Sequence, residues 1–149
     1  MESKAKPWFF LSMLLHLFFS LKNSLSTDVH SISMDQTLSV DQTISSKGEI
    51  FELGFFKPGK SQNYYMGIWY KQLSERTVVW VANTETPLPN KYSSCLKIDQ
   101  DGNLVLLNQL GTPIWSIDVS TIASNSTVAE LLDTGNFVMR DGSDSSAVI

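Results

Sequence analysis

A short stretch in the second half of the chain carries polar side chains at every second position. If this stretch is an extended strand, side chains two positions apart point to the same face. That face holds two carboxylates, an amide and two aliphatic side chains: Asp99, Asp101, Asn103, Val105 and Leu107. Carboxylates accept hydrogen bonds from hydroxyl groups, an amide donates and accepts, and an aliphatic side chain packs against ring carbons. The spacing therefore favours noncovalent binding of a sugar, and no residue in the row needs to be a nucleophile.

The centre of this stretch recurs 33 residues later in the chain. Asp-Gly-Asn-Leu-Val at 101–105 is repeated as Thr-Gly-Asn-Phe-Val at 134–138, which makes Asn136 and Val138 further candidate binding residues. A period of about 20 to 50 residues is typical of units that stack their apolar faces on their copies. The alternative is turn formation, because Asp-Gly and Gly-Asn pairs favour tight hairpins by themselves.

Tryptophan residues show a second repeat. Residues 79–83 resemble residues 114–118, which places Trp80 and Trp115 at equivalent positions. Aromatic rings bury large apolar areas and hold small domains together. We therefore predict a structural core in which Trp69, Trp80 and Trp115 converge.

Short β-rich runs separated by turn residues fill the chain after residue 27, and no segment keeps the apolar spacing of a helix. The first two of these runs, at residues 50–56 and 64–70, are expected to pair as a hairpin. Strands are expected at residues 50–56, 64–70, 77–82, 95–98, 103–107, 113–117, 129–132 and 137–140. This pattern predicts an all-β sandwich, barrel or prism.

The N-terminus has the layout of a secretory signal peptide. Lys4 and Lys6 precede an apolar run at 8–21, and a run of about 14 residues is shorter than the about 20 that span a bilayer. We predict a signal peptide at residues 1–26, with an uncleaved membrane anchor as the alternative. Export would make Asn125 of the Asn-Ser-Thr sequence a glycosylation site.

Charge and cysteine content narrow the possible partners. The chain has 149 residues, enough for one compact core, and without residues 1–26 it holds eight basic and 14 acidic residues, a net charge of −6. Such a surface argues against nucleic acid as a partner. Cys95 is the only cysteine, so no disulfide forms within the chain. It is either a small buried apolar residue or an unpaired thiol whose partner lies in another chain.

Enzymatic chemistry finds no support in the sequence. The two histidines are His16, inside the predicted signal peptide, and His30, so neither a histidine metal site nor a Ser-His-Asp arrangement can be built. Phosphate-binding glycine loops and kinase motifs are absent from the sequence. We predict a domain without catalytic residues, metal or cofactor.

Four further motifs occur in the order expected for one family. They are LGFFKPG at 53–59, MGIWY at 66–70, TVVWVAN at 77–83 and LLDTGN at 131–136. In this respect the chain, from about Val29 to Arg140, resembles the bulb-type lectin domain that opens the S-domain ectodomain of plant receptor-like kinases. The resemblance implies a β-prism of three four-stranded antiparallel sheets with pseudo-threefold symmetry. It places the lectin domain at residues 27–145, followed by a truncated tail at 146–149.

The resemblance also implies a mannose motif, Gln-x-Asp-x-Asn-x-Val-x-Tyr, once in each subdomain. In the middle copy Asp101, Asn103 and Val105 match, whereas Asp99 stands in place of Gln and Leu107 in place of Tyr. The last copy keeps the Asn and the Val and reads Leu132, Thr134, Asn136, Val138 and Arg140. The first copy keeps only its ends and reads Gln62, Tyr64, Met66, Ile68 and Tyr70.

Two functions follow from this resemblance. One is a secreted or extracellular module that binds mannose or mannose-containing glycans. The other is a degenerate lectin ectodomain of a receptor-like kinase that contacts proteins, as a homo- or hetero-oligomer with related ectodomains. It would lie at the plasma membrane if the full-length protein has a membrane span and a kinase region. A net hydrogen bond is worth about 1 kcal/mol, so a site that lacks two polar groups loses roughly tenfold to a hundredfold in affinity.

Overall fold

The computed structural model describes residues 29–89, 92–117 and 126–143. These residues form eleven β-strands and no helix. The strands are β1 (Ser31–Ser33), β2 (Thr37–Ser39), β3 (Thr43–Ser45), β4 (Phe51–Phe56), β5 (Tyr65–Tyr70), β6 (Val78–Val81), β7 (Cys95–Ile98), β8 (Leu104–Leu107), β9 (Pro113–Ile117), β10 (Thr127–Leu131) and β11 (Phe137–Asp141). The predicted signal peptide and Asn125 lie outside the described residues.

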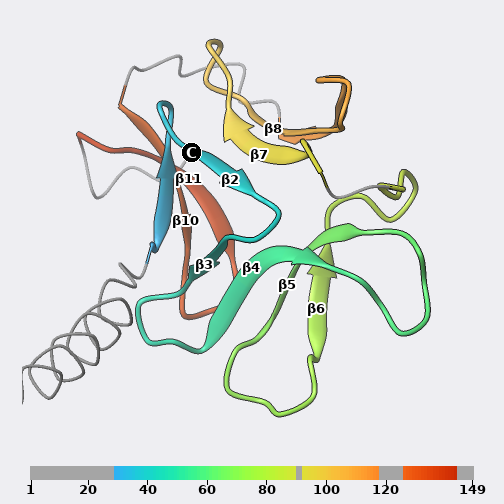
Figure 1. Ribbon diagram of the computed structural model, residues 1–149. Helices are drawn as coiled ribbons and strands as arrows, with labels where there is room; N and C mark the ends of the chain where they lie inside the picture. The colour runs from blue at the N-terminus through green and yellow to red at the C-terminus, as the bar shows by residue number, and fades with distance from the viewer. Residues whose placement is uncertain (1–28, 90–91, 118–125, 144–149) are drawn as a thin grey trace, which may run out of the picture.

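The strands make three antiparallel sheets, which confirms the predicted fold class. Their strand orders are β3-β4-β5-β6, β2-β7-β8-β9 and β1-β10-β11. Figure 1 shows the green β4–β6 strands on one side, the yellow β7 and β8 on another, and the orange-red β10 and β11 on the third. Each sheet begins with one short strand from the segment 31–45 and continues with a hairpin from later in the chain.

The strands expected from sequence are confirmed, including the β4–β5 hairpin. The three short strands at 31–33, 37–39 and 43–45 were not predicted. Each has three residues, with one buried aliphatic side chain between two hydroxyl-bearing residues. A run of that length carries too little periodicity to be recognised.

Rows of paired apolar residues run across the sheets and form the core. Members of a row lie opposite one another on neighbouring strands, so their side chains share a face. The rows are Ile44, Leu53, Ile68 and Trp80 in the first sheet, Leu38, Leu96, Leu106 and Trp115 in the second, and Ile32, Ala129 and Met139 in the third. These three core rows make the pseudo-threefold symmetry visible at the level of single residues.

The predicted convergence of three tryptophans is wrong. Trp69 is 4% exposed, but it follows Ile68 along β5 and therefore points to the opposite, outer face of its sheet. There its indole N–H donates to Glu52 at 2.9 Å and its ring packs edge-on against Phe56, with ring centroids 6.2 Å apart. The buried core cluster instead consists mainly of aliphatic side chains, together with Phe51 and Phe55.

Trp80 and Trp115 do meet, in an edge-to-face pair with ring centroids 5.5 Å apart. Trp115 is half-buried against the core, whereas Trp80 remains 37% exposed. Within the described ranges, two of the three core rows therefore end in an indole.

The third sheet differs from the expected four strands. Among the described residues it has three, so β11 is the last strand of its sheet. Within the same residues, no helix has the length and hydropathy of a membrane span.

Candidate functional site

The middle copy of the sugar motif lies at the β7–β8 turn rather than along one strand. The Asp99 carboxylate accepts hydrogen bonds from the backbone N–H groups of Asp101, at 3.0 Å, and Asn103, at 2.9 Å. Gly102 has a φ of 82°, which suits glycine, and its N–H donates to the carbonyl of Asp99 at 3.1 Å. The prediction of an extended face from residue 99 onward is therefore wrong, since the Asp99 side chain closes the turn.

The later part of the motif does lie on a strand. Leu104 and Leu106 of β8 point into the core, so Val105 and Leu107 lie on the outer face, away from the core rows. Val105 is 6% exposed and stands between Lys97 of β7 and Ser116 of β9.

The polar members of the motif precede this strand. Asp101 is exposed, and Asn103 is half-buried directly before β8. Both residues thus precede a strand whose outer face carries Val105 between Lys97 and Ser116. Such a surface can hold a polyhydroxylated ligand by hydrogen bonds and apolar contact.

The last copy is occupied by an ion-pair network. Val138 and Arg140 lie on one face of β11; Val138 lies directly opposite Glu130 on β10, and Arg140, opposite Val128, lies diagonally across from Glu130. The Arg140 Nε lies 3.4 Å from a Glu130 carboxylate oxygen, and the Lys47 Nζ lies 2.9 Å from the other oxygen. Arg140 stands where the family motif has Tyr, so this copy presents a guanidinium group in place of a phenol.

The turn before β11 is tied to a distant loop. The Asp133 carboxylate accepts a hydrogen bond from the Gly48 N–H at 2.7 Å. The pKa of the Asp133 carboxyl lies below its usual value, mainly because of a hydrogen bond from the Ser46 hydroxyl and next because of the one from the Gly48 N–H. Sequence reasoning missed Asp133, because its partners lie about 85 positions earlier in the chain.

The centre of the first copy lies in the core. Met66 and Ile68, at its centre, are 1% and 2% exposed. The ring of Tyr64 lies under the Lys57 ammonium group, 5.6 Å from the ring centroid. Polar groups for a sugar are therefore lacking at the centre of this copy.

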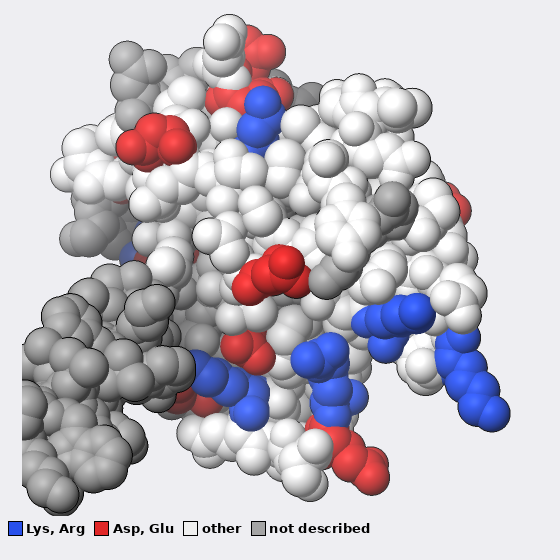
Figure 2. Space-filling view, in the orientation of Figure 1, with Lys and Arg blue, Asp and Glu red and all other residues white. Residues whose placement is uncertain are grey.

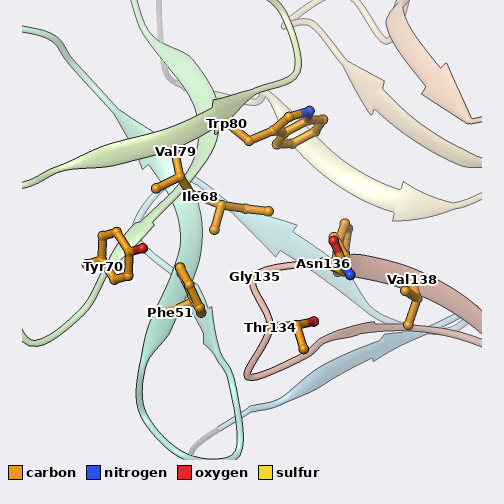
Figure 3. A pocket seen from close by; sticks show the side chains of 10 residues that line it. Phe51, Ile68, Tyr70, Val79, Trp80, Thr134, Gly135, Asn136 and Val138 are labelled. Carbon is orange, nitrogen blue, oxygen red and sulfur yellow. The ribbon is translucent and has the colours of Figure 1, made fainter.

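A pocket of about 630 Å³ opens between the first sheet and the β10–β11 turn (Figure 3). Phe51, Tyr70 and Trp80 lie on one side, and Asn136 and Val138 lie on the other. The structure thus brings Asn136 and Val138 together, but on a different sheet from Asp101, Asn103 and Val105. Sequence spacing did not reveal this pocket, since its two walls lie more than 50 residues apart in the chain.

Cys95 lies on β7, partly buried and opposite Leu107. Burial raises the pKa of its thiol above the usual value, and the nearby Lys97 charge opposes that shift. Partial burial and a raised pKa are typical of a structural cysteine that packs within a sheet rather than of a reactive thiol.

Charged residues are mixed on the face that Figure 2 displays. Lys and Arg lie mainly over the lower part, where the β4–β6 sheet runs, and Asp and Glu are scattered among and above them. This face has no continuous basic surface of the kind that nucleic acid binding requires.

Solved structures with the same architecture are known. The Marasmius oreades lectin superposes with a TM-score of 0.57 at 13% sequence identity, over 81% of this chain and 87% of that lectin. The mannose-specific agglutinin of snowdrop (Galanthus nivalis), solved with methyl-α-D-mannoside, superposes with a TM-score of 0.54 at 22% identity, over 79% of this chain and 94% of the agglutinin. The fold is that of the bulb-type lectins.

Sequence comparison gives a closer relationship. The family model for D-mannose binding lectin matches residues 77–149. Receptor-like serine/threonine-protein kinase SD1-8 of Arabidopsis thaliana is 50% identical over 139 residues, which are 93% of this chain and 16% of the kinase. The chain belongs to the bulb-type lectin domains of the G-type lectin S-receptor-like kinases. It spans about a sixth of the length of SD1-8, and the match lies in the lectin part, which is not catalytic.

Proposed function

We propose that this domain binds mannose or mannose-containing glycans, without catalysis, at the outer face of the second sheet. Asp101 and Asn103 would bond the sugar hydroxyls, and Val105 would contact the ring carbons. Asp99 would act through the turn, because its carboxylate holds the backbone of both polar residues. That double hydrogen bond is the observation that carries the proposal, since it holds the backbone of Asp101 and Asn103 in one turn before any ligand arrives.

Two comparisons support a sugar as the ligand. The matching family model is described as D-mannose binding, and the snowdrop agglutinin with the same fold was solved with methyl-α-D-mannoside. The middle copy is favoured within this chain, because the centre of the first copy is buried in the core and Arg140 of the last copy pairs with Glu130.

Calorimetric titration of the folded domain with methyl α-mannoside tests the proposal. We expect weak binding in the millimolar range that falls about tenfold in Asn103→Ala, because one or two hydrogen bonds of about 1 kcal/mol each are lost. Asn136→Ala is the matched control, since it removes the equivalent amide from the last copy and should leave the affinity unchanged. Absence of heat at millimolar sugar would rule out the site, and a loss confined to Asn136→Ala would place binding in the last copy.

The relatives favour a second function for the protein to which this domain belongs. SD1-8 is a receptor-like kinase, and its lectin region aligns with nearly the whole of this chain. We propose that the domain lies outside the cell and contacts related ectodomains as a homo- or hetero-oligomer. Capture of a related ectodomain that persists in excess methyl mannoside would support protein contact, whereas elution by the sugar would assign the contact to glycans.

A further inference from the structure

A second pocket, of about 360 Å³, opens beside β2 and β7 at one edge of the second sheet. We call it the β2–β7 pocket. Its lining combines hydroxyl groups, an amide, a carboxylate and an aromatic ring, and includes Thr37, Ser39, Asp41, Gln42, Tyr92 and Ser93. Hydroxyl, amide and carboxylate groups hydrogen-bond sugar hydroxyls, and an aromatic ring packs against the ring carbons. The pocket therefore has the chemistry of a carbohydrate site.

The aromatic ring of this pocket is presented to solvent. Tyr92 is 70% exposed, more than any other aromatic residue in the described part of the chain. Aromatic side chains usually gain stability by burying their rings in a core or an interface. The ring of Tyr92 is therefore available to carry the apolar face of a ligand.

The polar wall of the pocket is ordered by its own hydrogen bonds. The Ser39 N–H donates to Gln42 Oε1 at 2.9 Å, and the Gln42 N–H donates to the Ser39 carbonyl at 3.0 Å. Ser39 also pairs with Cys95 of β7, which lines the same pocket. The turn at residues 39–42 is thus held before a ligand arrives, which lowers the entropic cost of binding.

The pocket shares a face with the proposed mannose site. Leu38 and Leu96 are buried in the core, so their neighbours along β2 and β7 lie on the outer face of the second sheet. Two rows cross that face, one through Thr37, Lys97 and Val105 and the other through Ser39, Cys95 and Leu107. Since neighbouring strands lie about 4.8 Å apart, Val105 of the motif is about 10 Å from Thr37 of the pocket, across β7.

We propose that the β2–β7 pocket binds further sugar units of a mannose-containing oligosaccharide whose first unit lies at Asn103 and Val105. The inference rests on the proposed mannose function and adds an oligosaccharide to it as the ligand. A single sugar ring over Val105 does not reach Tyr92, because β7 lies between them, whereas an oligosaccharide crosses that strand. Asp41 and Ser39 would bond hydroxyls of the distant units, and Tyr92 would contact one ring face.

Calorimetric titration of the full chain with methyl α-mannoside and with an α-linked mannopentaose tests this subsite. We expect the mannopentaose to bind at least about tenfold more tightly, because the pocket adds contacts without a second loss of translational freedom. Tyr92→Ala should remove this gain and leave the affinity for methyl mannoside unchanged. Tyr92→Phe keeps the ring and should keep the gain. Leu110→Ala is the matched control, since it removes an 81% exposed side chain from the β8–β9 turn and should change neither affinity.

Amide chemical shifts measured by NMR show where each sugar binds. Methyl mannoside should shift the amides of Asn103 and Val105, and the mannopentaose should also shift those of Ser93 and Cys95. Equal affinities for the two sugars, a gain that persists in Tyr92→Ala, or unshifted Ser93 and Cys95 would overturn the subsite and leave the mannose site in place. Shifts at Ser93 and Cys95 with none at Asn103 would instead overturn the mannose site, so the two failures are distinguishable.

Discussion

At the scale of the residue, one acidic side chain, Asp99, closes the turn of the candidate site. Asp99 stands where the family motif has Gln, and its carboxylate organises a tight turn by bonding two backbone N–H groups. An Asp side chain readily makes this contact, because it is short enough to reach the backbone two residues ahead. At this position the chain thus has a residue that forms the turn, where the motif has Gln. Asp101 and Asn103 are the same residue types as in the motif.

The pH dependence of stability belongs to the same scale. Hydrogen bonds lower the folded-state pKa of Asp133 from its ordinary value of 3.8. A group whose pKa is lower in the folded state stabilises the protein above the unfolded pKa, and this stabilisation is lost as the pH falls through the folded pKa. We expect the urea midpoint to decline below about pH 4. In Asp133→Asn the decline should be shallower, and identical profiles for the two proteins would contradict this assignment.

At the scale of the element, the alternation of a strand decides which aromatic residues support the fold. Trp69 and Trp80 lie on neighbouring strands but on opposite faces of one sheet. Gly54 and Gly67 leave room on the outer face for large rings, since a Cβ at Gly54 would lie 3.1 Å from the Trp69 ring and one at Gly67 would lie 2.7 Å from the Phe56 ring. The outer aromatic layer thus depends on two residues without side chains.

The two tryptophans should respond differently to truncation. Trp69→Ala removes a buried ring, its hydrogen bond to Glu52 and its stacking with the Arg76 guanidinium, which lies 4.5 Å from the ring centroid. We expect a loss of about 3 to 5 kcal/mol in the free energy of unfolding. Trp80→Ala should cost less, about 2 to 3 kcal/mol, because about a third of its surface is already exposed. Urea unfolding of both variants measures this difference. Equal losses in the free energy of unfolding would show that Trp80 supports the core as much as Trp69 does.

At the scale of the whole molecule, three sheets of similar plan surround one aliphatic core. Each sheet joins a short early strand to a later hairpin, so the segment 31–45 connects all three units. Such non-local pairing makes the domain cooperative, because no unit is completed by consecutive residues alone. The sugar motif occurs once per unit, but the copies differ, because the centre of the first is buried and the last includes Arg140, which pairs with Glu130.

Export of the molecule can be tested directly. When the chain is expressed in plant cells, we expect secretion with loss of residues 1–26 and a glycan on Asn125. Mass spectrometry of the recovered protein should give an N-terminus at Thr27, and Asn125→Gln should remove the mass of the glycan. Retention of the N-terminal segment on the recovered protein would favour the membrane-anchor alternative.

The sequence by itself determined the all-β class, most strand positions and the three copies of the motif, because strand alternation and turn chemistry are local properties. Alternation along the chain also predicted Asp101, Asn103 and Val105 as candidate binding residues. The tertiary structure decided the state of each copy, since the burial of Met66 and Ile68 depends on packing in the core and the pairing of Arg140 with Glu130 depends on the register of neighbouring strands. It also separated Trp69 from Trp80, because the face on which a strand residue lies has meaning only relative to its neighbouring strands.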